Sequence, residues 1–136
     1  MSVGFKIDFL RYEIGHGDFL HSFFSTISYH LEPEGWGTKY PYLLNHLYNG
    51  KLCVTDVAKA VTELEEVRSK LTHFSPNEVI WDIENLNKKP PWGTNISGDI
   101  TNLSNYFVTS DGRDLFDVIF VTFKDSQDLK VNIEIE

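Results

Sequence analysis

Both ends of the chain alternate apolar and polar residues, and this pattern limits the possible folds more than any other feature. Apolar side chains occupy every second position from Val3 to Phe9 and again from Val131 to Ile135. A period of two residues is typical of a β-strand that buries one face and exposes the other. We therefore expect the chain to begin and end with a strand, and we expect these two strands to pair in one sheet.

Three segments between these strands place apolar residues at helical spacing. The first follows Asp18, a candidate N-cap, and continues to Leu31. A shorter segment covers residues 40–48, and a long amphipathic one covers residues 55–74. Several helices are therefore expected to pack against the sheet.

Three other segments are less clear from their residues. Residues 79–83 alternate like a strand, and we prefer this interpretation to a helical turn that starts at Ser75. Residues 99–106 could hold one short helical turn. Residues 115–124 could form a helix capped by Ser110 or Asp111, although the run inside this segment is rich in strand formers. We favour the helix there.

The length of the chain suits one domain. At 136 residues it can bury a sizeable core, and its ten phenylalanines predict a bulky one. No internal repeat, low-complexity tract or linker divides residues 1–136. We therefore expect a single small α+β domain, in which the N- and C-terminal strands pair in a sheet and several helices pack against it.

The charge of the chain restricts its partners. It has 20 acidic and 12 basic residues, which give a formal net charge of −8. Proteins that bind nucleic acid neutralise phosphates with lysine and arginine, so this balance argues against nucleic acid as a ligand. An acidic surface instead favours encounter with a basic protein.

Several features favour a cytoplasmic protein. Cys53 is the single cysteine and cannot form an internal disulfide, so we expect it to be a small buried apolar residue. No apolar run approaches the roughly 20 residues that a membrane helix needs. The N-terminal residues lack the uninterrupted apolar core of a secretory signal. We therefore expect a reducing compartment and no membrane contact.

Few residues form a grouping that could carry chemistry. His16, Asp18 and His21 include good zinc ligands, but a capping Asp18 would turn its carboxylate toward backbone amides, so surface histidines are the favoured interpretation. Asp82 and Glu84 would share one face of a strand and could act as an acid and a base, although a solvated face is favoured. Neither a phosphate-binding loop nor a serine elbow occurs. The sequence assigns no catalytic residue, no metal and no cofactor.

Residues 79–115 are rich in the residue types that recognise protein surfaces. Two of the three tryptophans, Trp81 and Trp92, lie in this segment. Trp81 belongs to an alternating apolar set and is expected in the core. Trp36 and Trp92 lie in loops rich in glycine and proline, where core packing and contact with a partner are both open.

Four motifs carry a family resemblance, namely Gly17-Asp18-Phe19-Leu20, Trp81-Asp82-Ile83-Glu84, Pro90-Pro91-Trp92-Gly93 and Asp111-Gly112-Arg113-Asp114-Leu115-Phe116. Through these motifs the chain resembles the immunity protein 70 family of bacterial polymorphic toxin systems over nearly its full length. The resemblance implies a small cytoplasmic α+β protein that binds the toxic domain of a cognate effector and blocks it without catalysis. It also favours a helix after Gly112.

The leading hypothesis is an immunity protein that binds a cognate toxin domain, with a basic nuclease as one candidate for the toxin. The alternatives are a small acidic enzyme that uses Asp82 and Glu84, and a regulatory or self-assembling module without a toxin. Arg113 is expected to pair locally with a neighbouring aspartate. The residues expected to contact the toxin are Trp36, Asp82, Glu84, Trp92, Asp111 and Asp114.

Overall fold

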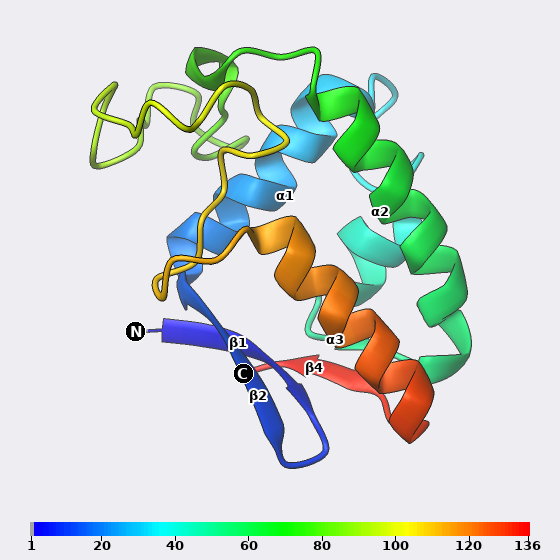
Figure 1. Cartoon of the computed structure of the whole chain (residues 1–136). Coiled ribbons are helices and arrows are strands. Elements are labelled where there is room, and N and C mark those ends of the chain that lie inside the picture. The colour runs from blue at the N-terminus through cyan, green and yellow to red at the C-terminus, as the bar shows by residue number, and fades with distance from the viewer. Residues whose placement is uncertain (1) are drawn as a thin grey trace.

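The computed structural model describes residues 2–136, in which the first and third long helices pack on a small antiparallel sheet and the second long helix packs on them (Figure 1). In chain order the elements are β1 (Ser2–Ile7), β2 (Leu10–His16), α1 (Gly17–Leu31), the π-helical η1 (Tyr42–Leu47), β3 (Lys51–Leu52), the 3₁₀ turn η2 (Val54–Asp56), α2 (Val57–Leu71), the 3₁₀ turn η3 (Pro76–Glu78), α3 (Leu115–Leu129) and β4 (Ile133–Ile135).

The two terminal strands lie side by side in the sheet. Within the described residues the strand order is β2-β1-β4-β3, and every neighbouring pair is antiparallel. Phe5 of β1 pairs with Ile135 of β4. Phe5, Ile7 and Ile133 are at most 1% exposed, so one face of the sheet contributes to the core. The predicted pairing of the terminal strands and the α+β class are both confirmed.

The hairpin of β1 and β2 corrects the expectation for the first strand. Phe9 does not continue the buried face, because its side chain lies at the hairpin tip and is 86% exposed. The chain reverses at Asp8, whose φ is 54°, a conformation that aspartate tolerates better than most residues. Leu10 then pairs with Ile7 and starts β2, a strand that the sequence interpretation missed.

The start of α1 also differs from the prediction. The helix begins at Gly17, and its N-cap is His16 instead of Asp18. The His16 Nδ1 atom accepts a hydrogen bond from the Asp18 backbone N–H at 3.0 Å, which satisfies one of the free donors of the first turn. The helix otherwise runs to Leu31 as predicted, and Phe23, Phe24 and Ile27 on its inner face are fully buried.

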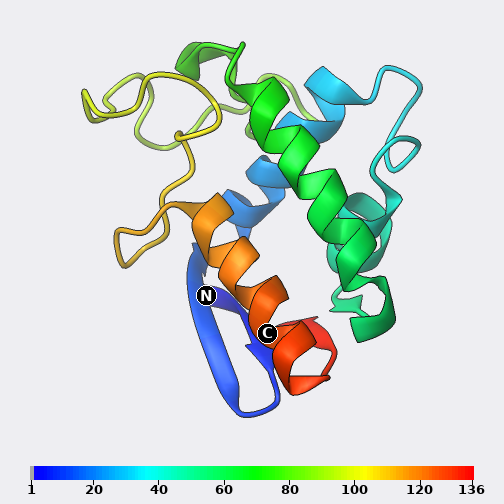
Figure 2. The ribbon, with the colours of Figure 1, turned by 45° about the vertical axis from the view of Figure 1, so that its right-hand side comes forward.

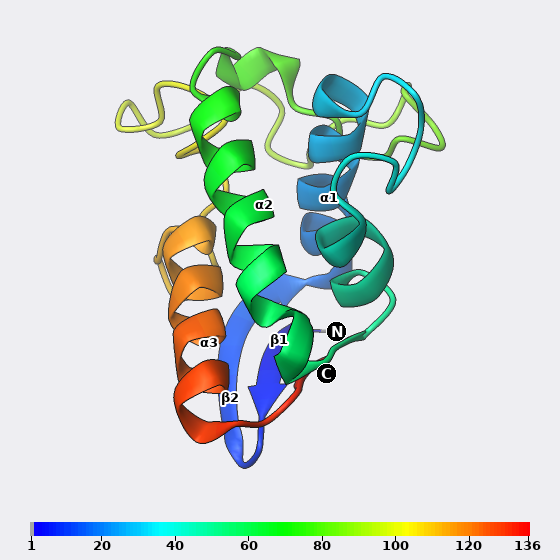
Figure 3. The same cartoon turned by 90° about the vertical axis from the view of Figure 1, so that its right-hand side faces the viewer.

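The helix α2 forms an outer layer that packs mainly on α1, α3 and η1 (Figures 2 and 3). It confirms the long helix expected in residues 55–74, and its apolar face is buried through Leu64 and Leu71.

The expectation of a buried Cys53 is wrong, since this residue is exposed where the chain crosses the surface between β3 and η2.

Two glutamates hold the segment between α1 and η1. Glu32 is 3% exposed, and its carboxylate accepts hydrogen bonds from three backbone N–H groups between Gly37 and Tyr40 at 2.9 to 3.0 Å. Glu63 of α2 accepts the Leu43 backbone N–H at 3.0 Å at the start of η1. Burial raises the pKa of Glu63 to about 7. The short helix expected in residues 40–48 is present with π geometry.

The helix α3 confirms the helical prediction for residues 115–124. Its N-cap is Asp114, however, and not Ser110 or Asp111, because the Asp114 carboxylate accepts the Asp117 backbone N–H at 3.3 Å. Ile119 is fully buried, so tertiary packing outweighs the strand preference of this apolar run.

Residues 79–114 contain no helix or strand, and their one bridge joins Val108 to Asp114. The strand expected in residues 79–83 and the helical turn expected in residues 99–106 are therefore both wrong. The segment lies beside α1 and passes over the start of α3 (Figure 1). Its backbone is tied to the rest of the fold at separate points, for example by the hydrogen bond from Leu103 N–H to the Phe74 carbonyl at 3.0 Å.

Candidate partner-binding site

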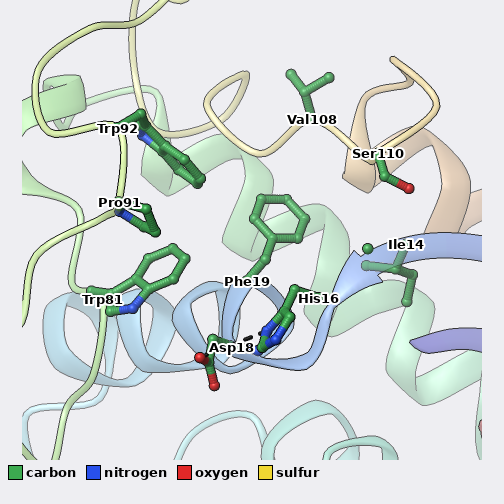
Figure 4. Close-up of a pocket in the computed structure, with 10 residues that line it drawn as sticks. Ile14, His16, Asp18, Phe19, Trp81, Pro91, Trp92, Val108 and Ser110 are labelled. Carbon is green, nitrogen blue, oxygen red and sulfur yellow. Dashed lines mark hydrogen bonds and ion pairs between the residues drawn. The ribbon is translucent and has the colours of Figure 1, made fainter. Parts of the chain in front are cut away.

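A hollow of about 360 Å³ lies where the irregular segment meets the start of α1 (Figure 4). Its lining comes from three parts of the chain, namely Ile14, Gly15, His16, Asp18 and Phe19, then Trp81, Pro91 and Trp92, and finally Val108 and Ser110. In Figure 4 the two tryptophans stand on one side, Val108 and Ser110 stand on the other, and Phe19 lies between them. We call this site the aromatic hollow. Its volume is at the lower end of the range of about 300–1,000 Å³ for ligand pockets, which suits a single side chain.

The two tryptophans form perpendicular walls. Their ring centroids are 5.4 Å apart and their planes meet at 87°. The Trp92 Nε1 atom donates a hydrogen bond to the Tyr106 hydroxyl at 2.8 Å. Because the polar atom of the Trp92 ring is hydrogen-bonded inside the molecule, the part of the ring that stays exposed is apolar, and the residue as a whole is 38% exposed.

Buried hydroxyl groups of α1 hold the wall in place. Ser22 Oγ donates to the Ile80 carbonyl at 2.7 Å, and Thr26 Oγ1 accepts the Ile80 N–H at 3.1 Å. Ser25 Oγ accepts the Ile83 N–H at 3.2 Å. These contacts replace the strand pairing predicted for this segment, and they fix the backbone on both sides of Trp81.

A carboxylate lies at the edge of the aromatic hollow. Asp18 lines the site from the first turn of α1, and its side chain is 72% exposed. The nearest ring nitrogen, His16 Nδ1, is 3.6 Å from the Asp18 carboxylate. That nitrogen accepts the Asp18 N–H and so carries a lone pair, which means that the two side chains form no ion pair in this arrangement.

Two further acidic side chains flank Ser110 at the opposite edge. Asp111 follows it in sequence, and the Glu13 carboxylate accepts the Ser110 hydroxyl at 3.5 Å. Both acids have arginine partners, since Arg113 lies 3.1 Å from Asp111 and Arg11 pairs with Glu13. The hydrogen bond from Arg11 lowers the pKa of Glu13. The predicted local pairing of Arg113 is confirmed.

A second hollow of about 450 Å³ lies on the other side of residues 81–84 and is lined by His21, Trp36, Tyr48, Ile83 and Glu84. We call it the His21 hollow. The His21 ring joins the Tyr48 hydroxyl at 2.9 Å to the Asp82 carboxylate at 3.1 Å. The Glu84 backbone N–H, together with His21, lowers the pKa of Asp82. A lowered pKa suits a carboxylate that stays charged and does not suit a general acid at neutral pH.

A third hollow, of about 720 Å³, lies beside the loop that carries Trp92. It is lined by Ser75, Pro76, Asn77, Val79, Lys89, Pro90, Gly93, Thr94, Ile96 and Tyr106. This set contains neither a tryptophan nor an acidic side chain. The aromatic hollow, although smaller, has two tryptophans and an aspartate in its lining.

The structure divides the six residues expected to contact a partner among three places. Trp92 lines the aromatic hollow, and Asp111 only follows its lining residue Ser110 in sequence. Trp36 and Glu84 line the His21 hollow, where Asp82 hydrogen-bonds to His21, and Asp114 caps α3. Trp36 is partly buried, and its Nε1 atom donates to the Leu44 carbonyl at 2.8 Å. Asp114 faces Arg68 at 3.8 Å, and burial raises its pKa. The two hollows share the short segment 81–84, whereas the Asp114 carboxylate is turned toward α2.

The sequence interpretation missed two parts of this site. Phe19 was assigned only to the buried face of a helix, yet it forms the floor of the aromatic hollow and is 8% exposed. Ser22, Ser25 and Thr26 interrupt the apolar face of α1 and are fully buried. Buried hydroxyls need hydrogen-bond partners, and these three find theirs on Ile80 and Ile83 of the docked segment. Three of them on one apolar face are the available signal for such a segment.

Within residues 2–136, no three histidine, cysteine, aspartate or glutamate side chains lie close enough together to hold a metal ion. No helix in the same residues combines the length and the apolar character that a membrane span requires.

Comparisons with known proteins add one match. A family model described as Immunity protein 70 matches residues 5–135. No curated protein and no solved structure matches the chain. The matched range includes every residue that lines the two hollows.

Proposed function

The chain belongs to the immunity protein 70 family, and on this basis we propose that it binds the toxic domain of a cognate bacterial polymorphic toxin and neutralises it by stoichiometric protein–protein interaction. We also propose that it acts in the cytoplasm, where such a toxin would otherwise reach its target. For this kind of neutralisation the immunity protein only has to bind the toxin domain and does not have to catalyse a reaction.

The aromatic hollow is the observation that supports this function best. Binding energy in protein interfaces is concentrated in a few residues, among which tryptophan, tyrosine and arginine are enriched. Trp92 is a rigid anchor of this kind, because Tyr106 and Trp81 hold its ring while 38% of it remains exposed. A partner that covers Trp92 would bury apolar surface at little cost in side-chain entropy.

The charge of the protein supports a basic partner. The net charge of −8 favours rapid encounter with a positively charged domain. Asp18, Glu84 and Asp111 add exposed carboxylates around the two hollows. A nuclease domain, whose surface must attract phosphates, is a toxin of suitable charge.

The alternative enzyme would have used Asp82 and Glu84. Asp82 is instead engaged with His21 and with the Glu84 backbone N–H, and the two carboxylates do not lie on one face of a strand. This arrangement favours a structural role for Asp82. The self-assembling module would bury Trp36 or Trp92 in a copy of the chain, and analytical ultracentrifugation of the purified protein separates that alternative from toxin binding.

The experiment starts with affinity capture by the tagged protein from lysate of its native host, followed by purification of the toxin domain identified. Dissociation constants are then measured for wild type, Trp92→Ala and Asp111→Lys. We expect Trp92→Ala to weaken binding by at least about 30-fold, the size of a hot-spot effect. Asp111→Lys should mainly slow association, because it reverses a charge at the edge of the site.

Two variants serve as matched controls. Leu129→Ala removes an apolar side chain that is 50% exposed at the end of α3. Asp128→Lys reverses an exposed acid that, like Asp111, has a basic neighbour, here Lys124 at 2.9 Å. Both controls should bind as wild type does. If Trp92→Ala and Asp111→Lys fold and also bind as wild type does, the proposed surface is wrong.

A further inference from the structure

This inference rests on the proposed function and concerns what enters the aromatic hollow. We propose that the hollow receives one cationic side chain of the toxin, an arginine in preference to a lysine, which lies against the tryptophan walls and pairs with Asp18. Trp81, Trp92, Phe19 and Asp18 are then the residues that recognise this side chain.

The walls suit a cation. Tryptophan is the best aromatic partner for a cation placed within about 6 Å of its ring, and a guanidinium group can also stack flat on the indole. The perpendicular rings of Trp81 and Trp92 form a corner, and the Phe19 ring lies beside it (Figure 4). A planar group that enters this corner can lie on one ring while its edge meets the other.

The charges around the hollow leave one carboxylate for this side chain. Glu13 and Asp111 already pair with Arg11 and Arg113. Asp18, in contrast, has no lysine or arginine within 4.0 Å among residues 2–136, and the His16 nitrogen facing it carries a lone pair.

The neighbouring acid Asp82 is also engaged. It hydrogen-bonds to His21 at 3.1 Å and lies 3.6 Å from the Lys88 ammonium group. The described lining of the aromatic hollow contains no lysine or arginine, so no lining side chain would repel an incoming cation. The site thus combines an apolar corner with one negative charge at its edge.

An apolar side chain would fill the corner but would leave Asp18 without a partner at the edge of a closed interface. Covering a carboxylate without pairing it costs free energy, whereas a guanidinium group satisfies the carboxylate and the rings together. A lysine offers a compact and more strongly hydrated charge, so it would gain less from the rings. These differences favour arginine.

The test uses small probes and does not need the toxin. The probe is an acetylated and amidated Gly-Arg-Gly peptide, and the reference is the same peptide with citrulline, which has nearly the same shape and no charge. Binding is followed through the indole N–H signals of Trp81 and Trp92 in two-dimensional NMR spectra. We expect millimolar binding of the arginine peptide, at least threefold weaker binding of the citrulline peptide, and shifts centred on Trp92.

Variants connect the probe to the side chains. Asp18→Asn should weaken the arginine peptide by about twofold to fivefold, as for an exposed ion pair, and should leave the citrulline peptide unchanged. Trp92→Ala should abolish the response of the remaining Trp81 signal. Asp128→Asn, which neutralises an exposed acid on α3, should have no effect.

The proposal is overturned if the two peptides bind equally, if neither moves the indole signals, or if Asp18→Asn leaves the arginine peptide unaffected. Such a result would not touch the proposed function provided that the wild-type protein still binds its toxin domain. If the wild-type protein binds no toxin domain, the proposed function fails whatever the peptides do. The two failures are therefore distinguishable.

Discussion

Thr26→Val should detach the wall of the aromatic hollow from α1 without changing the surface that a partner meets. Thr26 is fully buried on α1, so a toxin cannot touch it. Its hydroxyl accepts the Ile80 N–H at 3.1 Å and donates to the Ile80 carbonyl at 3.2 Å. Valine keeps the volume and the helix propensity of threonine but can make neither hydrogen bond.

The size of the effect follows from these two bonds. The lost bond to the Ile80 carbonyl contributes about 1 kcal/mol net, and the loss of the other bond leaves the Ile80 N–H without its partner at a cost of about 1–3 kcal/mol. The Ile80 carbonyl keeps the Ser22 hydroxyl at 2.7 Å, so it adds no such penalty. We therefore expect Thr26→Val to lower the free energy of unfolding by about 2–4 kcal/mol. Part of this loss will appear as local detachment of residues 80–83.

Three measurements check this prediction. Urea unfolding gives the free energy, hydrogen exchange of the Ile80 amide reports local opening, and titration with the toxin domain gives the affinity. Thr26→Ser is the control, because it keeps the hydroxyl and loses only a methyl group, worth about 1 kcal/mol. If Thr26→Val unfolds at the same urea concentration as Thr26→Ser and its Ile80 amide exchanges no faster than in wild type, the docking argument is refuted.

Three other predictions concern the segment around η1. The folded pKa of Glu63 is raised to about 7 by burial, so the stability linked to its protonated form is complete below pH 4.5 and is lost as the pH rises through 7. Urea unfolding at pH 5 and 8 measures this loss, which is at most about 3 kcal/mol for wild type. Glu63→Gln should abolish the difference in the free energy of unfolding between the two pH values, whereas Glu65→Gln, on the exposed side of α2, should keep it. Glu32→Ala should destabilise by about 3–6 kcal/mol in thermal unfolding, because three backbone N–H groups lose a charged acceptor, and a change below about 1 kcal/mol would contradict this. Gly37→Ala should lower the melting temperature, since Gly37 has a φ of 76° and an added Cβ would overlap Asn45, while Gly98→Ala should have little effect because that position is open.

The fold could be predicted where periodicity is continuous. The terminal strands follow from alternation, and α1 and α2 follow from helical spacing. The residues of α3 left helix and strand both open, and the helix was favoured there partly through the family resemblance. The hairpin was missed although a signal was present, since apolar residues move from odd positions up to Ile7 to even positions from Leu10. A shift of this kind is what a two-residue turn produces.

Helix starts were predicted less well. Both Asp18 and Asp111 are residues typical of N-caps, but the structure uses His16 and Asp114. Several polar residues near a helix start can accept hydrogen bonds from the same backbone N–H groups. Which of them becomes the N-cap depends on the angle at which the chain enters the helix. For α1 this angle is set by β2, the strand that the sequence interpretation missed.

The site could be predicted only in its residue types. Composition and turn context point to Trp92 and Asp111; Trp92 lines the aromatic hollow, and Asp111 is the neighbour in sequence of its lining residue Ser110. The position of Trp81 depends on hydrogen bonds between Ile80 and hydroxyls of α1 about 54 residues earlier in the chain. The residues around Trp81 do not indicate which distant part of the chain they contact, so only the three-dimensional structure identifies α1 as the partner of Ile80.

The most direct test of the central claim is a titration of the toxin domain's own activity with the purified chain. The account predicts that activity falls linearly and is abolished at an equimolar ratio by wild type and by Leu129→Ala, whereas Trp92→Ala requires a large excess. Retention of full toxin activity at a saturating excess of the wild-type chain would contradict neutralisation by binding. Equal inhibition by wild type and Trp92→Ala would contradict the role given to the aromatic hollow.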